Sequence, residues 1–408
     1  PDHGGRVCLV MGAGNINSIP PTDVASKLFT EGKVCLLKMS PVNAYLGPIL
    51  EEAFAEAVAR GVLALVQGGA EEGAYLAHHP SVDEVHITGS DRTHDAIVWG
   101  SPGPERAERL ARNRPLLAKE ITSELGNVSP VLVVPGPWDP ATLGAQAESV
   151  AGAVTHNASF NCNAAKLLVL PRGWSSREAF LSGLERALGR APARVPWYPG
   201  ARERYRAFTE GRANVRRVGG GEEVLPWTLV TGLDASAPDP AFSTEPFCAI
   251  LSETSVGSED PLEYLERAVE FVNERVWGTL AAHLVVHPRT LADPRLGRAV
   301  EEAIRRLRYG TVAVNVWAGY GFGFGTTPWG AFPGSPLSAI QSGRGFVHNT
   351  LMLEGVEKTV VRHPARTFPK PPYFPSHRTA HRLGRRLVDL EARGWVAMPG
   401  VVAAGVRG

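Results

Sequence analysis

The stretch RVCLVMGAGNINSIPPTDVASKLFTEGKVCLLK, residues 6–38, decides the fold of the first part of the chain. Its apolar run 7–11 predicts a β-strand, and the segment 24–30 predicts a helix that ends at Gly32. The second apolar run, 34–38, predicts another strand. A strand, a helix and a strand in this order indicate a right-handed βαβ unit and therefore a parallel sheet.

The same alternation continues to residue 88. We expect helices at 45–60, with Gly61 as its C-cap, and at 71–78, and strands at 63–67 and 84–88. Parallel sheets of this kind bind ligands at the carboxyl ends of their strands. Residues 1–123 are therefore predicted to form a Rossmann-like cofactor domain.

A second α/β region follows the Pro-rich loops 101–104 and 135–140. We predict a catalytic domain over residues 124–345, and an oligomerisation strand with a basic tail over 346–408. The expected elements of the second domain are a helix at 141–156 and strands at 166–170, 227–231, 249–251, 282–286 and 311–315.

Composition excludes several functional classes. The chain has 408 residues, 44% of them hydrophobic and 20% charged, which suits a globular protein of two or three domains. Its net charge of +1 gives no overall attraction to nucleic acid, and no apolar run reaches the ~18–20 residues of a membrane span. The four cysteines form no CxxC pair, so we expect no metal site, and reduced thiols in a cytoplasmic protein.

The two ends of the chain carry expectations of their own. The sequence opens at Pro1, without an initiator Met and almost directly in a strand, so we expect that residues upstream of it are not represented. In the tail, Arg378, Arg382, Arg385 and Arg386 recur at roughly helical spacing, which is typical of a solvated helix face.

Cys162 is the first candidate for chemistry. It begins a small polar turn, Cys162–Ala165, that leads into the apolar strand 167–170. Such a turn presents the thiol at the edge of a strand, where backbone N–H groups and a base can help to form the nucleophilic thiolate. A buried structural cysteine is the alternative interpretation, and it is the commoner one for a lone cysteine.

Glu124 is the second candidate. It precedes Leu125-Gly126 between two apolar runs, where the chain passes between the two predicted domains. A partly desolvated carboxyl at such a place has a raised pKa, which suits a general base. An exposed interdomain glutamate is the alternative.

Two turns after strands complete the set. Gly89 and Ser90 follow the strand 84–88, and the N-terminus of a following helix binds phosphate. Asn15 follows the first strand, and its amide there can donate to an oxyanion. Neither turn matches GxGxxG, and a turn-forming asparagine is the ordinary reading of the latter.

The order and separation of these segments resemble the aldehyde dehydrogenase superfamily from about Val7 to about Arg362. Glu124-Leu-Gly is similar to the family's general-base motif, and Cys162 follows it by 38 residues, close to the usual gap. The other matching segments are Lys27–Lys38, Val82–Ser90, Thr244–Phe247 and Pro328–Gly330.

The resemblance implies a role for each matched residue. Cys162 is expected to be the nucleophile, Glu124 the base, and Asn15 the oxyanion donor together with the Cys162 backbone N–H; a two-residue slip would put Asn17 in the place of Asn15. NAD or NADP is the implied cofactor. Its expected contacts are Lys38 and Ser40 at the adenosine ribose, Gly89 and Ser90 at a phosphate, Glu245 at the nicotinamide ribose and Phe247 beside the ring.

Several residues depart from the family pattern. Ala13-Gly14 replaces the usual Pro-Trp before the asparagine, His94 replaces a glycine, and Phe160-Asn161 and Asn163 flank the nucleophile. Pro41 stands where an acidic residue often bonds the ribose 2′-OH, which removes one bar to NADP. The family's long N-terminal portion has no counterpart.

The resulting function is NAD(P)-dependent oxidation of an aldehyde to a carboxylic acid through a thioester on Cys162. Two alternatives remain: a coenzyme A-dependent acylating dehydrogenase or acyl-CoA reductase, and a catalytically degraded homologue that binds a nucleotide or a partner. The aromatic loop 316–327 is expected to line an apolar acyl channel, with a packed loop as the alternative. Residues 356–362 resemble the family's subunit-bridging strand, so a homodimer or homotetramer is expected.

Overall fold

The first sheet forms one lobe of the molecule. The computed structural model describes residues 4–408, so the expectation about Pro1 lies outside the described residues. Six strands stand in the order β14-β5-β4-β1-β2-β3, parallel except for β14. Their bounds are β1 Val7–Met11, β2 Val34–Lys38, β3 Leu63–Val66, β4 Glu84–Thr88, β5 Glu120–Glu124 and β14 Gly343–Arg344. The predicted parallel sheet and α/β class are confirmed.

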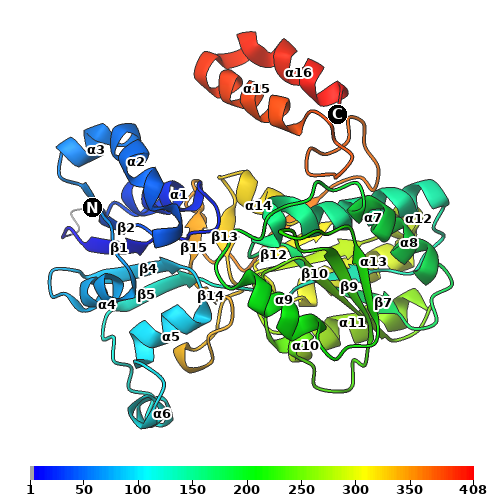
Figure 1. Cartoon of the computed structure of the whole chain (residues 1–408), viewed down its shortest axis with the longest axis horizontal. Helices are drawn as coiled ribbons and strands as arrows, with labels where there is room; N and C mark the ends of the chain where they lie inside the picture. The colour runs from blue at the N-terminus through cyan, green and yellow to red at the C-terminus, as the bar shows by residue number, and fades with distance from the viewer. Residues whose placement is uncertain (1–3) are drawn as a thin grey trace.

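The second sheet lies beside the first (Figure 1) and has eight strands in the order β16-β12-β11-β6-β7-β10-β9-β8. Only β8 runs antiparallel to its neighbour. A small antiparallel pair, β13 with β15, completes the strands. The bounds are β6 Ser129–Val133, β7 Ala165–Pro171, β8 Val215–Val218, β9 Trp227–Leu233, β10 Ile250–Val256, β11 Ala281–Val285, β12 Thr311–Val314, β13 Pro328–Gly330, β15 Phe346–His348 and β16 Thr359–Arg362.

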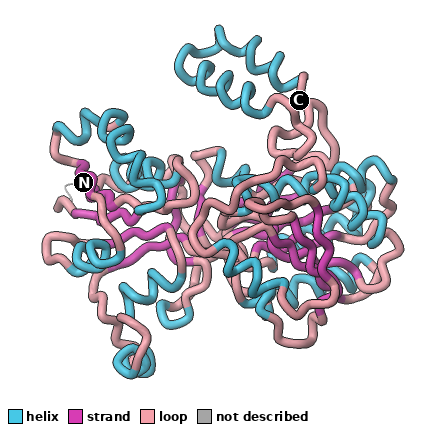
Figure 2. The backbone as a smooth tube through the Cα atoms, in the orientation of Figure 1, coloured by secondary structure: helices cyan, strands magenta, loops and turns pink. Residues whose placement is uncertain are grey.

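Helices cover both sheets (Figure 2). Those of the first lobe are α1 Ile19–Ala25, α2 Gly47–Ala53, α3 Ala55–Ala59, α4 Ala70–His78, α5 Asp91–Trp99 and α6 Pro104–Ala111. Those of the second are α7 Pro140–Thr155, α8 Arg177–Leu188, α9 Ala201–Thr209, α10 Pro240–Ser243, α11 Pro261–Arg275, α12 Pro288–Ala292, α13 Pro294–Arg306 and α14 Gly319–Gly323. The tail forms α15 Ala380–Arg393 and α16 Met398–Val406, and short 3-10 or π segments are η1 Ser26–Thr30, η2 Pro41–Leu46, η3 His156–Ser159, η4 Leu337–Ala339 and η5 Gly394–Ala397.

Two helices differ from the sequence prediction. The helix expected at 24–30 begins earlier, at Ile19, because Pro20 and Pro21 occupy its first turn, where proline needs no hydrogen-bond donor; it continues as the π segment η1. The helix expected at 45–60 is broken into η2, α2 and α3. Pro48 starts a new helix there, and Phe54 leaves helical geometry at φ −107° and ψ 23°.

The second sheet carries most of the core, because apolar side chains cover it on both faces. Every residue of β7 is buried, with Leu167 and Val169 on one face and Leu168 and Leu170 on the other. Strands that are buried on both faces lose the alternation of apolar and polar residues and are rich in Leu, Val and Ile. Truncating one such leucine to alanine typically costs about 2–5 kcal/mol of stability.

The chain crosses between the lobes more than once. Residues 125–128 lead from β5 to β6, and β14 returns from the second lobe to pair with β5. The division at residues 123 and 345 remains a proposal, since β14 contributes to the first sheet from within residues 124–345. The strand β16 is bonded to β12 of its own chain along one edge, so its role between subunits also remains a proposal.

The basic tail forms a helical hairpin that stands off the two sheets (Figure 1, red). Helix α15 packs against α16, and the Thr379 hydroxyl donates to the Ala404 carbonyl at 2.7 Å. Among residues 4–408, no helix has both the length and the apolar content to cross a lipid bilayer.

Candidate active site

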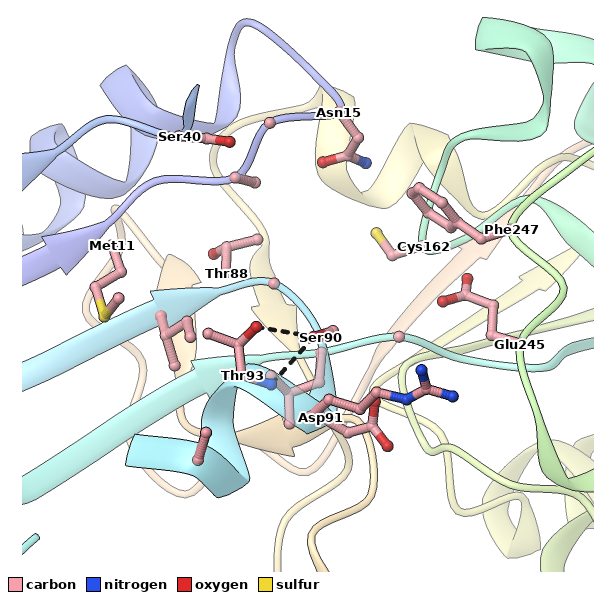
Figure 3. Close-up of a pocket in the computed structure, with 18 of the residues that line it drawn as sticks. Met11, Asn15, Ser40, Thr88, Ser90, Asp91, Thr93, Cys162, Glu245 and Phe247 are labelled. Carbon is pink, nitrogen blue, oxygen red and sulfur yellow. Dashed lines mark hydrogen bonds between the residues drawn. The ribbon is translucent and has the colours of Figure 1, made fainter. Parts of the chain in front are cut away.

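A cavity of about 1010 Å³ lies between the two lobes. One wall consists of the carboxyl ends of β1, β2 and β4 with the start of α5, which is the edge where a parallel sheet is expected to bind ligands. The opposite wall carries Cys162, Glu245 and Phe247. Figure 3 shows the Cys162 sulfur facing Asn15 across this space. The cavity therefore brings together all the residues that the sequence singled out for catalysis and cofactor binding.

Cys162 and Glu124 are in direct contact. The thiol donates to Glu124 Oε1 at 3.1 Å, although 38 residues separate them in the chain. Glu124 ends β5 and is 3% exposed, and Cys162 precedes the central strand β7 and is partly exposed to the cavity. The interpretations of Glu124 as an exposed interdomain residue and of Cys162 as a sealed core thiol are both wrong.

Burial dominates the electrostatics of this pair. Burial raises the pKa of Glu124 to about 7; the charge of Asp23 acts in the same direction, and contacts with Cys162 and Trp329 oppose it. Burial, assisted by Glu124, also holds the pKa of the Cys162 thiol well above its usual range, while the buried ammonium of Lys166 opposes this. A carboxyl that titrates near neutrality suits a general base, and the thiol needs such a base to become nucleophilic.

The loop before Cys162 has a left-handed backbone. Asn157, Ala158 and Ser159 have φ of 51°, 54° and 70° in succession, a conformation that costs of order 1–3 kcal/mol per residue without glycine. Hydrogen bonds hold the loop in place: Lys166 Nζ donates to the Ser159 carbonyl at 2.8 Å, and Asn161 Nδ2 donates to the His156 carbonyl at 3.2 Å. The surrounding structure thus fixes the position of the thiol.

Asn15 is tied to the same loop. Its Nδ2 donates to the Phe160 carbonyl at 2.9 Å, and its own carbonyl accepts from Asn157 Nδ2 at 2.9 Å. A side-chain amide has two N–H donors, so one remains for another acceptor. Asn15 lines the cavity, whereas Asn17 accepts from the exposed Tyr45 hydroxyl at 3.1 Å; the geometry therefore favours Asn15 over Asn17 as the candidate donor.

The far end of the cavity holds the four candidates for the adenosine side. Lys38 and Ser40 lie at the end of β2, and Gly89 and Ser90 at the end of β4. Ser90 caps α5: its hydroxyl accepts from the Thr93 backbone N–H at 3.2 Å, as Figure 3 shows. Burial lowers the pKa of Lys38, and Glu72 opposes this. Small residues, a helix N-terminus and a lysine at one edge suit the phosphates and ribose of a dinucleotide.

Glu245 and Phe247 lie at the other end. Burial raises the pKa of Glu245 to about 7, opposed chiefly by Lys166 and by the Asn127 backbone N–H, which donates to its carboxylate. A side chain at Gly126 would overlap with this carboxylate, so glycine leaves the carboxylate its present position. Phe247 has a strained φ of 42° and packs at 5.7 Å from the Phe160 ring. The segment after Glu124 thus positions Glu245 as well.

Sequence reasoning missed two basic residues near the thiol. Arg204 Nε donates to the Pro246 carbonyl at 3.0 Å and its Nη2 to the Phe247 carbonyl at 3.2 Å, which holds the Glu245–Phe247 segment. Lys166 is 1% exposed and lies 5.4 Å from the Phe247 ring centre. Arg204 belongs to a polar amphipathic helix and Lys166 to a strand, and neither pattern signals a site. Within residues 4–408, no cluster of His, Cys, Asp and Glu has the arrangement of a metal site.

The aromatic loop 316–327 is packed rather than open. Trp317 Nε1 donates to the Asn163 carbonyl at 2.9 Å, and the Trp317 and Tyr320 rings lie 5.7 and 5.8 Å from that of Tyr373. None of its residues lines the cavity that holds Cys162. The expectation of an open acyl channel here is therefore wrong for this cavity, because Tyr373 from the C-terminal segment fills the space beside the loop.

These features define a class of protein. A parallel nucleotide-type sheet faces a second α/β lobe across one cavity, and a cysteine paired with a buried glutamate lies where the lobes meet. The comparisons with known proteins agree with this class. Residues 19–195 match the model of the Aldehyde dehydrogenase family.

Two curated relatives are similar over part of the chain. 4-Trimethylaminobutyraldehyde dehydrogenase A of Danio rerio is 33% identical over 128 residues, which is 31% of this chain and 23% of the relative. Betaine aldehyde dehydrogenase 2 of Rhizobium meliloti is 32% identical over 182 residues, which is 44% of this chain and 33% of the relative. The matched part thus spans about a quarter to a third of these relatives' length.

Solved structures share the fold over more of the chain. An aldehyde dehydrogenase of Mycobacterium tuberculosis complexed with NAD+ is 22% identical with a TM-score of 0.62, covering 86% of this chain and 67% of that one. An NADP-dependent glyceraldehyde-3-phosphate dehydrogenase of Bacillus halodurans complexed with NADP is 19% identical with a TM-score of 0.63, covering 84% and 66%. Together, the comparisons show that residues 19–195 are similar to the Aldehyde dehydrogenase family and that the chain shares the fold of solved aldehyde dehydrogenases.

Proposed function

We propose that this protein oxidises an aldehyde to a carboxylic acid with NAD+ or NADP+, through a covalent thioester on Cys162. The observation that carries the proposal is the 3.1 Å contact between Cys162 Sγ and Glu124 Oε1 at the end of a cavity that has the residues for a dinucleotide. The aldehyde dehydrogenase names of the relatives support the same reaction.

The chain's own residues account for each step. Glu124 takes the thiol proton, and the Cys162 thiolate attacks the carbonyl carbon, so that a C–S bond forms and the carbonyl oxygen becomes an oxyanion beside the Asn15 amide. When bound, NAD(P)+ would supply the hydride acceptor for that carbon. After Glu124 has lost its first proton, it takes one from water; the resulting hydroxide attacks the thioester, the C–S bond breaks and the acid leaves.

The residues in the cavity fit the cofactor. We infer that Lys38 and Ser40 contact the adenosine ribose, that Ser90 donates to a phosphate which the small Gly89 lets approach closely, and that Glu245 accepts from the nicotinamide ribose. Because Pro41 lines the cavity where a carboxylate would repel a 2′-phosphate, both cofactors are retained in the proposal.

The deciding assay uses purified protein, NAD+ or NADP+ and a panel of aldehydes, with and without coenzyme A. Absorbance of reduced cofactor that grows without coenzyme A supports the hydrolytic reaction. Growth only in its presence would support the acylating alternative, and no growth with any aldehyde would support the degraded homologue. Glu124 favours hydrolysis, since transfer of the acyl group to a thiol has less need of this base.

We predict that Asn15→Ala lowers kcat/KM by about 10²–10³-fold, because one oxyanion donor contributes roughly 2.7–4 kcal/mol. Cofactor affinity should change little, since the removed amide faces the thiol rather than the adenosine end. Steady-state kinetics and cofactor titration measure the two effects. Asn17→Ala is the matched control, and equal losses in both variants would contradict the assignment of Asn15.

We predict that Gly126→Ala weakens cofactor binding by about tenfold, equivalent to ~1.4 kcal/mol, because the new methyl group displaces the Glu245 carboxylate. Fluorescence titration with NAD+ and NADP+ measures the affinity. The control is Gly144→Ala in α7, where a Cβ meets nothing within 4 Å and alanine favours the helix. Unchanged affinity in a folded Gly126→Ala variant would contradict the role of Glu245.

A further inference from the structure

Next to Glu124 lies a cluster of buried polar side chains that the proposed reaction does not use. Thr122 and Glu124 on β5, and His86 and Thr88 on β4, share one face of the first sheet, because side chains alternate along a strand and Thr88 is the register partner of Glu124. Helix α1 covers this face and places Asp23 on it, 0% exposed.

Hydrogen bonds connect part of the cluster. The Thr88 hydroxyl donates to Asp23 Oδ2 at 2.8 Å, and His86 Nε2 lies 3.6 Å from the same oxygen. His86 Nδ1 is 2.8 Å from the Thr122 hydroxyl. The polar contacts thus connect Asp23 to β4 and, through His86, to β5, and both strands end at the active site.

His348 approaches from a third direction. The strand β15 contacts both α1 and β5, and His348 at its end is 4% exposed with a left-handed φ of 69°. Its ring lies 4.9 Å from that of Phe322. The charge of Asp23 acts on both Glu124 and His348. It raises the pKa of Glu124, and it opposes the burial that lowers the pKa of His348.

Several atoms in this cluster have no hydrogen-bond partner within the protein: Glu124 Oε2, Asp23 Oδ1, His86 Nε2 and both ring nitrogens of His348. Buried polar atoms in folded proteins are bonded either to protein or to ordered water, and one buried water typically makes about three such bonds. The Cys162 thiol donates to Glu124 Oε1, which leaves Oε2 as the carboxylate oxygen without a hydrogen-bond partner.

We propose that Asp23 and His348 are a proton-relay pair: His348 receives the proton of Glu124 through a bridging water, and Asp23 stabilises the resulting imidazolium. This inference rests on the proposed function, because Glu124 must lose a proton after activating the thiol and again after activating water. In the relay step the Glu124 O–H bond breaks, a His348 N–H bond forms, and the proton then passes to bulk water from beside the exposed segment 350–355.

The other titratable groups near Asp23 leave its charge available for this role. Glu84, farther along β4, is in contact with Lys33, and Lys27, one turn after Asp23, pairs with Glu31 at 2.7 Å. The groups that face Asp23 are therefore His86 on β4, Glu124 on β5 and His348 on β15. Asp23 and His348 act through Glu124, so they are positioning and relay residues rather than catalytic ones.

The test compares Asp23→Asn, His348→Asn and the double variant in the full chain. Asparagine keeps an acceptor for Thr88 and tolerates the left-handed backbone of residue 348, so both variants are suited to folding. Removing the charge of residue 23 should shift the acid limb of turnover to lower pH by at least about half a unit, because one like charge nearby raises a carboxyl pKa. His348→Asn should keep the first burst of reduced cofactor but slow turnover by about tenfold or more.

The control is His283→Asn, because His283 is also buried with an unpartnered Nε2 but lies on β11 in the second lobe. If the two residues serve one relay, the double variant should be no slower than the worse single variant, since effects within one network are not additive. An unshifted pH profile in Asp23→Asn, together with normal turnover in His348→Asn, would overturn the relay.

A measurement without substrate separates this inference from the proposed function. The carboxylic C=O infrared band of protonated Glu124, identified by its loss in Glu124→Gln, should titrate at lower pH in Asp23→Asn than in the unaltered protein. If no aldehyde is oxidised but the titration of Glu124 shifts in Asp23→Asn, the coupling between Asp23 and Glu124 is supported and the proposed function fails. If aldehydes are oxidised and the band does not shift, the relay fails and the proposed function stands.

Discussion

Cys162→Ala is expected to abolish aldehyde oxidation, with a loss on the order of 10⁶-fold, the scale seen when a covalent nucleophile is removed. The expected loss includes the first turnover, because no C–S bond can form and the aldehyde carbon is never poised to lose a hydride. Rapid mixing with NAD+ or NADP+ measures the burst of reduced cofactor, which should disappear. Cofactor affinity should stay within a few-fold, since the adenosine-side residues are untouched.

The other cysteines provide the control for this result. Cys8, Cys35 and Cys248 are buried, whereas Cys162 is partly exposed to the cavity. Iodoacetamide should therefore label Cys162 first and inactivate the protein with one-to-one stoichiometry, because the reagent can reach this thiol. Cys35→Ala should keep its burst and its single reactive thiol. A burst that persists in Cys162→Ala would remove the covalent mechanism.

The first lobe was predictable from sequence because its signals are local. The strands Val7–Met11, Val34–Lys38 and Glu84–Thr88 form where the apolar runs predicted them, and the parallel pairing follows from the helices between them. Prolines caused the errors in the helices. Pro20 and Pro21, which lie outside the helix predicted at 24–30, occupy a first helical turn, and Pro48 divides what the apolar pattern suggested was one helix.

The candidate site was partly predictable for a different reason. Glu124 ends β5 and Asn15 follows β1, and the carboxyl ends of parallel strands converge, so the sequence already implied that these two residues are close. Cys162 precedes β7, and its place beside them was implied only by its spacing from Glu124. Asp23 and His348 could not be found in this way. Asp23 lies in a proline-rich segment that reads as exposed, and its burial depends on how α1 packs on β4, which no short sequence window contains.

Glu124→Gln is expected to separate the two halves of the reaction. The first burst of reduced cofactor should keep its amplitude but form more slowly, because Glu124 no longer takes the thiol proton, while the neutral amide no longer raises the pKa of the Cys162 thiol. Steady-state turnover should fall by about 10²–10⁴-fold, the usual contribution of a general base, since water then attacks the thioester unaided. Rapid-mixing amplitudes and steady-state rates on one preparation measure both effects.

The pH dependence of turnover provides a second test of the role of Glu124. Glu124 accepts a proton only as a carboxylate, and burial raises its pKa to about 7, so turnover of the unaltered protein should rise with pH through a midpoint near 7. An ordinary glutamate with a pKa of 4.5 would already be ionised at pH 6 and would leave the rate flat there. In Glu124→Gln this limb should disappear while the slow residual rate remains. If the limb persists in that variant, or if the burst disappears with it, another group deprotonates the water, and the short contact between Glu124 and Cys162 serves only to hold the thiol in place.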